Sequence, residues 1–348
     1  MLFRSGELLK RVSCPGLKIV ECPHLVRAIS PLTDLKAYFF LKKRFRAEKY
    51  DVVHTHSSKA GIVGRFAAKA AHVPFVAHTI HGLAFHRYEK FWKNFIYIAS
   101  ERAAAPCGKR IYAVAQAMID QSLAAGVGKP EQYKVVYSGM ELEPFLTSKP
   151  DPELRKSLGI PENAVVFATL ARLFPLKGYE TFIPVAIKLA KEIPDIHYLI
   201  IGNGSMMEEI QAQIAEAGLE KRFSFAGLVP PNEVWKYLAL SSALVHFSLR
   251  EGLPRAAVQS LASGKPVIAY ALDGTPEVVI PGKTGYLLQP GDRDGAEAAI
   301  REIMADPAHA TELGTNGREL VASRFGWRTM SDVLLKDYME QLAALEKK

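Results

Sequence analysis

The amino-acid sequence predicts an α/β protein with two doubly wound domains, each built on a parallel sheet. Short runs rich in Val and Ile alternate with helical patterns along the chain, as expected for parallel strands covered by helices on both faces. A proline-rich segment at 143–161 breaks this alternation, and the pattern restarts after it. Since 348 residues suffice for two cores, we expect a first domain at 1–145, a linker at 146–161, a second domain at 162–324 and a C-terminal helix at 325–348.

The first half contains five candidate strands with helical patterns between them. The proline-rich segment that follows predicts a linker with one short helix. The strands are expected at 17–22, 51–55, 75–80, 110–115 and 134–137, and the helices at 32–48, 59–71, 87–104 and 116–125.

The second half forms one complete doubly wound unit, and an amphipathic tail follows it. The tail at 325–345 carries a row of apolar side chains at helical spacing, so we expect it to pack back on the first domain. The row consists of Met330, Val333, Leu334, Tyr338 and Leu342. The strands are expected at 165–171, 197–201, 223–226, 243–248, 266–271 and 286–288, with a helix at 294–304.

The composition is that of an ordinary globular enzyme, with 49% hydrophobic and 23% charged residues. No apolar run reaches the roughly 18 residues that a membrane helix needs, and the first residues lack the apolar segment of a signal peptide. We therefore expect a cytoplasmic protein. Cys14, Cys22 and Cys107 fit neither a zinc site nor a disulfide framework, so we expect reduced thiols that serve in packing.

Positive charge is concentrated in the first half of the chain. Residues 1–150 contain 23 Lys and Arg against 11 Asp and Glu, whereas residues 151–348 contain 21 against 25. A basic first half favours an anionic partner, such as a phosphorylated acceptor, nucleic acid or anionic lipid at the inner face of the cytoplasmic membrane. An ordinary solvated surface explains the charge equally well, because the cations are interleaved with apolar residues.

The turn at 250–253 is the most informative part of the sequence. It joins an apolar strand to a short helix that we expect at 254–263, because Pro254 suits the first helical position and Gly264 the position after the end. Unpaired N–H groups and the positive end of the helix dipole favour a phosphate there. Glu251, beside that phosphate, would face a sugar.

A second loop places two cations at the same predicted sheet edge. Arg172 and Lys177 follow the strand at 165–171, where ligands bind in doubly wound sheets. Together they could stabilise a departing diphosphate, although solvated loop cations are the alternative.

Gly202 and Gly204 do not form a dinucleotide fingerprint, because Met207 takes the third glycine position. These glycines admit either a ligand or a tight turn.

Histidines gather at the edge of the first predicted sheet. His81 precedes Gly82 at a strand end, which suits hydrogen bonding to a substrate or proton transfer. A metal site formed with His78 and His86 is disfavoured, because neighbours at a strand end point to opposite faces. A polar loop that opens the next helix could bind an acceptor, through His56, Ser57 and Lys59. A structural role is the common alternative for each histidine.

Two basic, aromatic stretches at 38–45 and 87–95 have helical spacing. In the second, the aromatic residues at 88, 91, 92 and 95 form one stripe. We expect both stretches to pack against the sheet. Contact with a membrane surface through the Lys-bearing rim is the second explanation of these stretches. Stacking on nucleic acid comes last, since no nucleic-acid-binding motif accompanies the stretch, and nucleic acid is not an expected partner.

The chain carries six short motifs, which are Arg172 to Lys177-Gly178, Gly202-Asn203-Gly204, Phe225-Ala226-Gly227, Glu251-Gly252-Leu253-Pro254, Gly274-Thr275-Pro276-Glu277 and Phe325-Gly326-Trp327. They occur in the order and spacing of the retaining glycosyltransferases of family four, which this chain resembles over nearly its whole length. The first half is similar to bacterial members that build lipopolysaccharide, exopolysaccharide or capsule. The resemblance implies a GT-B fold, in which two Rossmann-like domains face a cleft, with the acceptor on the first and a nucleotide sugar on the second. It also implies transfer with retention and no metal or other cofactor.

The resemblance also implies roles for matching residues. Glu251 would hold the sugar hydroxyls, Gln259 the ribose, and His81 the reacting sugar or its departing charge. The diphosphate would lie on Arg172, Lys177, Gly252, Leu253 and Pro254, the donor pocket on Gly202, Gly204 and Gly227, and the acceptor on His56, Ser57, Lys59 and Gly82.

The chain departs from the family pattern at two places. The second acid of the family is Gln259 here, which keeps hydrogen-bonding capacity but removes a charge. The strand, glycine-rich loop and helix that open the first domain are not recognisable, so we expect an incomplete acceptor side. The expected activity is transfer from a nucleotide-diphosphate sugar, with UDP as the expected nucleotide, to a glycan or lipid-linked acceptor. A GT-B epimerase or phosphorylase and a non-catalytic or truncated sugar-nucleotide-binding protein are the alternatives.

Overall fold

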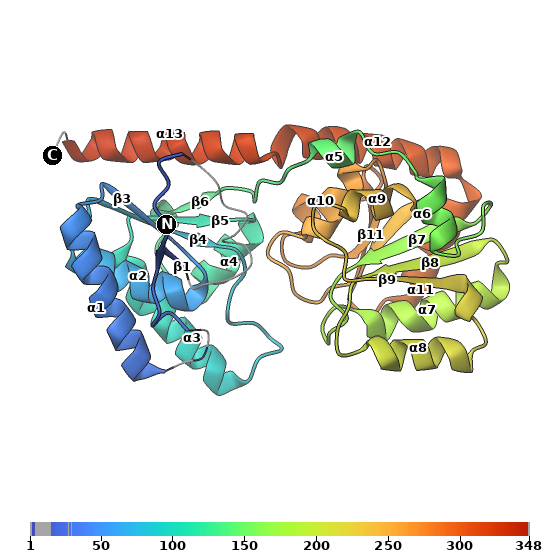
Figure 1. Cartoon of the computed structure of the whole chain (residues 1–348), viewed down its shortest axis with the longest axis horizontal. Coiled ribbons are helices and arrows are strands. Elements are labelled where there is room, and N and C mark those ends of the chain that lie inside the picture. Colours follow the sequence, from blue (N-terminus) through green and yellow to red (C-terminus); the bar gives the residue numbers. More distant parts are fainter. Residues whose placement is uncertain (1, 4–14, 27, 29, 347–348) are drawn as a thin grey trace. The chain divides into compact units, whose positions relative to one another are not determined.

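The computed structural model describes residues 2–3, 15–26, 28 and 30–346. These residues form two compact units (Figure 1). Unit 1 contains the chain up to Val136 together with the segment from Asp332 onward, and unit 2 runs from Tyr137 to Ser331. Each unit has its own parallel sheet, so the predicted α/β class with two Rossmann-like units is confirmed.

Unit 1 is built on a four-stranded parallel sheet in the order β3-β4-β5-β6. The strand predicted at 17–22 is wrong in extent: only Val20–Glu21 (β2) is extended, and it pairs in parallel with Leu2–Phe3 (β1) in a separate two-stranded sheet. The other strands are β3 (Val52–His56), β4 (Phe75–Ile80), β5 (Arg110–Ala113) and β6 (Tyr133–Val135). The helices are α1 (Pro31–Glu48), α2 (Ser58–Ala70), α3 (Phe91–Ala104) and α4 (Gln116–Ala124).

Alternation along the strands of unit 1 assigns side chains to two faces. Val53 and Val76 pack with α1 and α2, and Ile111 and Ala113 pack with residues of α3 and α4. Tyr112, between Ile111 and Ala113, points to the opposite face and meets the C-terminal helix. That helix, α13 (Trp327–Glu346), lies along this face from Asp332 onward (Figure 1).

Within unit 1, the C-terminal helix contacts the sheet through a buried acid as well as through apolar residues. The Asp337 side chain is 2% exposed and accepts hydrogen bonds from the Tyr112 hydroxyl at 2.6 Å, Arg110 Nε at 3.0 Å and Lys134 Nζ at 2.9 Å. One residue on, the Tyr338 hydroxyl bonds to the His54 ring. The apolar periodicity predicted the helix, but not this cluster.

Unit 2 is built on a six-stranded parallel sheet in the order β12-β11-β10-β7-β8-β9. The chain therefore leaves β7 in one direction to β8 and β9, and in the other to β10, β11 and β12. Ligands bind at such a switch point, outside the carboxyl ends of the strands. The strands are β7 (Val165–Leu170), β8 (Ile196–Ile201), β9 (Phe223–Gly227), β10 (Ala243–His246), β11 (Val267–Tyr270) and β12 (Gly285–Leu288).

Helices cover both faces of the unit 2 sheet (Figure 1). A large core cluster lies between one face and three helices, and it includes Phe167, Tyr198 and Val245 from the strands. These helices are α7 (Tyr179–Glu192), α8 (Met207–Glu216) and α11 (Arg293–Ala305). The other face carries α9 (Val234–Ala239), α10 (Arg255–Ala262) and α12 (Pro307–Arg324).

The proline-rich segment contains two short helices, not the predicted one. They are α5 (Glu143–Leu146) and α6 (Pro152–Ser157). Asp151 caps α6, because its carboxylate accepts the N–H groups of Glu153 and Leu154. The prolines near the start of each helix suit positions that make no intrahelical hydrogen bond.

The two basic, aromatic stretches have different environments. In α1, Leu41 and Phe45 are buried in the core, as predicted. In α3, the predicted packing against the sheet is wrong: Phe91, Trp92 and Phe95 are 86%, 56% and 67% exposed. The side of α3 that faces inward carries the partly buried Tyr97 and Ile98, the buried Glu101 and small residues instead.

Cys22 and Cys107 are buried free thiols, and burial raises the pKa of both, as expected for packing residues. Cys14 lies outside the described residues. Within the described ranges, no helix is both long and apolar enough to cross a membrane.

Candidate functional site

The carboxyl ends of β7 and β10 bring together charged side chains from two distant loops of unit 2. Lys177, in the loop after β7, donates a hydrogen bond from Nζ to Glu251 Oε1 at 2.7 Å and to Ser248 Oγ at 3.2 Å. Glu251 lies in the turn after β10, and His246 Nε2 at the end of β10 lies 3.6 Å from the same carboxylate oxygen. We call Lys177, His246, Ser248 and Glu251 the switch-point cluster.

Glu251 is ionised in this cluster. Burial alone would raise the pKa of its carboxyl, but the neighbouring His246 and Lys177 and the hydrogen bonds outweigh burial and lower the pKa. Burial lowers the pKa of His246 although the Glu251 carboxylate opposes this shift, so Lys177 is the permanent cation beside Glu251 at neutral pH. The cluster therefore presents a fixed anion beside a fixed cation at the sheet edge.

The turn that carries Glu251 is held by a neighbouring loop. The Glu251 N–H donates to Asp273 Oδ2 at 2.8 Å, and the Gly274 N–H donates to the Gly252 carbonyl at 3.1 Å. Asp273 has a left-handed φ of 51°. Sequence reasoning missed Asp273 as a support; its place before Gly274 was the available signal.

Helix α10 begins directly after this turn, at Arg255, one residue later than predicted, and it ends at Ala262 rather than 263. Pro254 is the N-cap, and the first helical hydrogen bond runs from Val258 N–H to its carbonyl at 3.2 Å. The amides before Val258 thus have no partner within the helix. Gln259 is half-buried and lies one turn into α10, while Gly252, Leu253 and Pro254 form the turn itself.

The remaining predicted donor residues differ in their surroundings. Arg172 is exposed, and its guanidinium lies 5.2 Å from the centre of the Phe174 ring. Gly227 has a left-handed φ of 65°, and a Cβ added there would meet open space. Arg172 shares the loop after β7 with Lys177.

Gly202 and Gly204 admit the backbone of a neighbouring loop. A Cβ on Gly202 would lie 1.9 Å from the Ala171 carbonyl oxygen, and one on Gly204 would lie 2.2 Å from the Leu173 carbonyl oxygen. The Leu173 N–H also donates to the Asn203 carbonyl at 3.1 Å. Because neither glycine has a Cβ, the loop that bears Arg172 and Lys177 can pack against them. The two glycines therefore influence the site indirectly, by fixing the position of that loop.

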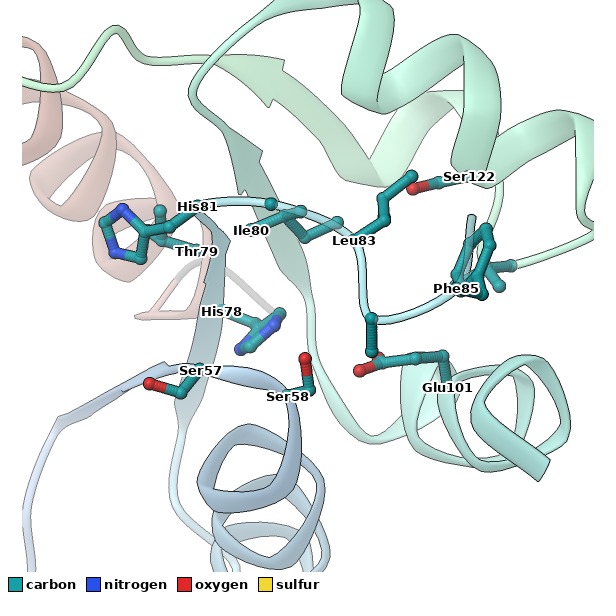
Figure 2. A pocket seen from close by; sticks show the side chains of 13 residues that line it. Ser57, Ser58, His78, Thr79, Ile80, His81, Leu83, Phe85, Glu101 and Ser122 are labelled. Atoms are coloured by element: carbon teal, nitrogen blue, oxygen red, sulfur yellow. The ribbon is translucent and has the colours of Figure 1, made fainter. Parts of the chain in front are cut away.

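Unit 1 has a pocket of about 250 Å³ at the carboxyl end of β4 (Figure 2). It brings together the predicted Ser57, His81 and Gly82. Figure 2 shows that the His78 ring points toward Ser58 and Glu101, whereas the His81 ring points away from them. The pocket is lined by Ser57, Ser58, residues 78–85, Glu101, Ser122 and Val127.

The histidines at this edge interact with one another. His56 Nδ1 lies 3.0 Å from His81 Nε2, and the two rings are stacked with centroids 5.2 Å apart. Burial and the neighbouring His81 lower the pKa of His56 to about 4, so the His56 ring is uncharged at neutral pH. Lys59 does not join them; it forms an ion pair with Asp34 Oδ1 at 2.5 Å.

A buried ion pair supports the pocket from below. Arg65 Nη2 donates to Glu101 Oε2 at 2.5 Å, and Arg65 Nε donates to the Gly61 carbonyl at 3.1 Å. The His78 ring packs against Gly61 so closely that a Cβ there would lie 2.3 Å from the ring. Sequence reasoning missed this support, because Arg65 and Glu101 lie on two helices with no shared motif.

The structure places no metal-binding group here: the described part of the chain contains no cluster of three or more His, Cys, Asp or Glu suited to a metal ion. His86, which the sequence placed near His81, has its backbone N–H and carbonyl bonded to the Asn94 side chain at 3.0 and 2.8 Å.

Comparisons with known proteins agree with this architecture. Residues 150–320 match the family model described as glycosyl transferases group 1, and residues 4–139 match the glycosyl transferase 4-like domain. The UDP-Gal:alpha-D-GlcNAc-diphosphoundecaprenol alpha-1,3-galactosyltransferase of Escherichia coli is 32% identical over 288 residues, which are 82% of this chain and 74% of that protein. The alpha-maltose-1-phosphate synthase of Mycolicibacterium smegmatis is 26% identical, over 91% of this chain and 85% of that protein.

Solved structures share the fold. Anabaena HepE in complex with UDP superposes with a TM-score of 0.78 at 23% identity, over 93% of this chain and 86% of that one. The sucrose-phosphate synthase of Thermosynechococcus elongatus gives 0.81 at 24% identity, over 96% and 85%. This protein is a glycosyltransferase that belongs to the group 1, family-four-type enzymes of GT-B fold.

Proposed function

We propose that this enzyme transfers a sugar from UDP-sugar, with retention of anomeric configuration, to a lipid-linked or glycan acceptor in cell-surface polysaccharide synthesis. The observation that carries the proposal is the Lys177–Glu251 pair at the switch point of unit 2, 2.7 Å apart and next to the start of α10. The galactosyltransferase relative, whose name gives a UDP-sugar and a diphosphoundecaprenol acceptor, supports this donor and acceptor class.

In the proposed reaction, the cations at the switch point bind the diphosphate and the carboxylate binds the sugar. The diphosphate is held by Lys177, Arg172 and the first amides of α10. These amides follow the turn of Gly252, Leu253 and Pro254. Together these groups stabilise the charge of the diphosphate as its bond to the sugar breaks. Glu251 accepts hydrogen bonds from the sugar hydroxyls, and Gln259 bonds the ribose. These groups supply the positive charge without a metal, so transfer should persist when EDTA is present.

The first test concerns the diphosphate. Arg172→Ala and Lys177→Ala should each weaken UDP binding by about 1.5 to 3 kcal/mol, because each removes a hydrogen bond to a charged group. Isothermal calorimetry measures the loss. Lys221→Ala removes an exposed cation at the amino end of β9 and serves as the control. The Arg172 variant is the more direct test, since Lys177→Ala also leaves Glu251 without its cation. Wild-type affinity in both variants would remove the diphosphate from this loop.

The second test concerns His81, which we propose takes part in the transfer step. His81→Ala should lower kcat on the order of 100-fold or more with the fold intact, the range typical of one positioned catalytic group. His24→Ala removes another unit 1 histidine, one that does not line the pocket, and should leave kcat unchanged. Steady-state transfer assays and far-UV circular dichroism measure both. Normal turnover of the His81 variant would leave that histidine with a structural role only.

The donor is identified by ligand-induced stabilisation. A ligand that binds only the folded state raises the melting temperature, so UDP should raise it more than GDP or ADP. Transfer assays with a panel of UDP-sugars and diphospholipid acceptors, with the product anomer assigned by NMR, then test the reaction. Stabilisation by GDP alone, or an inverted product, would overturn the proposal.

A further inference from the structure

The exposed face of α3 carries a compact aromatic patch. Phe91, Trp92, Phe95 and Ile96 lie at i, i+1, i+4 and i+5, which places them on one side of the helix, and all four are exposed. Single exposed apolar residues are normal on a protein surface, but a cluster of large ones on one helix face marks an interaction site. We call these four residues, with Tyr88 in the preceding loop, the α3 patch.

Cations surround the α3 patch. The Arg87 guanidinium lies 4.8 Å from the centre of the Tyr88 ring, and Lys93 Nζ lies 5.8 Å from that of Trp92. Lys90, at the start of α3, is exposed. The one acid in this stretch, Glu89, is paired with Lys93 at 3.2 Å. The patch therefore combines an apolar surface with a positively charged rim.

We propose that the α3 patch docks unit 1 on an anionic lipid surface. Aromatic side chains with an apolar body and a polar edge favour the membrane interface, and each Lys or Arg near an anionic surface adds attraction. An interfacial helix with aromatic residues on one face and cations at its border binds in this way. A second copy of the chain fits less well, because a symmetric contact through the same patch would bring the cations of both copies together.

The patch is attached firmly to the loop that lines the unit 1 pocket. The two hydrogen bonds between the His86 backbone and the Asn94 side chain, at 3.0 and 2.8 Å, hold the loop after Gly82 against α3. Docking would thus hold the pocket that contains His81 and Gly82 close to the lipid surface. This use of the patch rests on the lipid-linked acceptor proposed above, whereas lipid binding itself requires no donor or acceptor.

The test uses the full chain and lipid vesicles without substrate. The protein should co-sediment with vesicles that contain phosphatidylglycerol and not with phosphatidylcholine vesicles. The triple variant Phe91→Ser, Trp92→Ser, Phe95→Ser should lower the vesicle affinity by about 100-fold or more, because three apolar side chains no longer enter the interface. Lys90→Glu should lower it by about tenfold or more. Leu228→Ser, which removes an exposed apolar side chain from unit 2, should bind as the wild type does.

A second readout reports from the patch itself. In a protein with Trp235→Phe and Trp327→Phe, Trp92 is the remaining tryptophan, and its emission should shift to the blue on addition of phosphatidylglycerol vesicles. The proposal is overturned if the folded triple variant binds as the wild type does, if Leu228→Ser causes an equal loss, or if the Trp92 emission does not move. It is also overturned if the patch holds a dimer that the triple variant dissociates. The triple variant should transfer sugar to a water-soluble acceptor at the normal rate. This assay separates a loss of lipid binding from a failure of the proposed activity.

Discussion

Glu251→Gln should lower kcat on the order of 100- to 1,000-fold, the loss typical of removing one group that stabilises the transition state. The variant keeps the shape of the side chain but loses the anion that, in our proposal, orients the sugar hydroxyls. Its effect on UDP binding should be small, or even favourable, because Lys177 loses its 2.7 Å partner and becomes free to bind phosphate. Kinetics and calorimetry on the same variant should therefore diverge.

A matched control exists within unit 2. Lys188 and Glu297 form a second Lys–Glu pair with the same 2.7 Å separation, on the surface of the helical layer and not at the strand ends. Glu297→Gln should change neither kcat nor UDP affinity, because the pair lies on α7 and α11 and about half of its Lys188 side chain is exposed to solvent. An equal loss of turnover and UDP binding in Glu251→Gln, or no loss in either, would place the carboxylate outside the sugar site.

Asp337→Ala should destabilise unit 1 by about 3 kcal/mol or more. The substitution leaves the Tyr112 hydroxyl and the Arg110 and Lys134 cations without their shared acceptor on the C-terminal helix, and breaking a buried charge cluster on one side is costly. Asp332→Ala removes an exposed acid from the same helix and should stay within about 0.5 kcal/mol of the wild type. Because the two units need not unfold together, hydrogen exchange of the β5 and β6 amides during urea unfolding gives the measurement.

The pH dependence of this cluster has a defined sign. Burial would raise the pKa of Asp337, but the Tyr112 and Lys134 hydrogen bonds and the nearby cations outweigh it and lower the pKa below the value in the unfolded chain. The stabilisation is therefore complete above the unfolded pKa and is lost as the pH falls through the folded one. The wild type and Asp337→Ala should converge in stability at acid pH. A difference that persists unchanged into acid would assign the effect to packing alone.

Much of the site could be predicted because its chemistry is local. Pro254 and Gly264 bracket α10 to within one residue, and the acid at the turn before it follows from adjacent sequence. His246 and Asp273 were missed, because one stands in an apolar strand and the other in a loop whose contact with Glu251 is visible only in three dimensions. From the sequence, the glycines of the Gly202 motif could allow either the approach of a ligand or a tight turn. The structure shows that Gly202 gives space to the Ala171 carbonyl of the neighbouring loop.

The sequence by itself predicted the position of most strands, their division into two parallel-sheet units and the family, because hydrophobic period, turn residues and motif spacing act over short stretches of chain. Only the tertiary structure decided which side chains meet. Lys177 reaches Glu251 across 74 residues, and Asp337 reaches Arg110 across 227. The α3 patch shows the same limit, since its spacing is that of a buried helix face. The inward side of α3 is filled instead by Tyr97, Ile98 and the Glu101 ion pair, so packing of the whole unit leaves the aromatic side chains exposed.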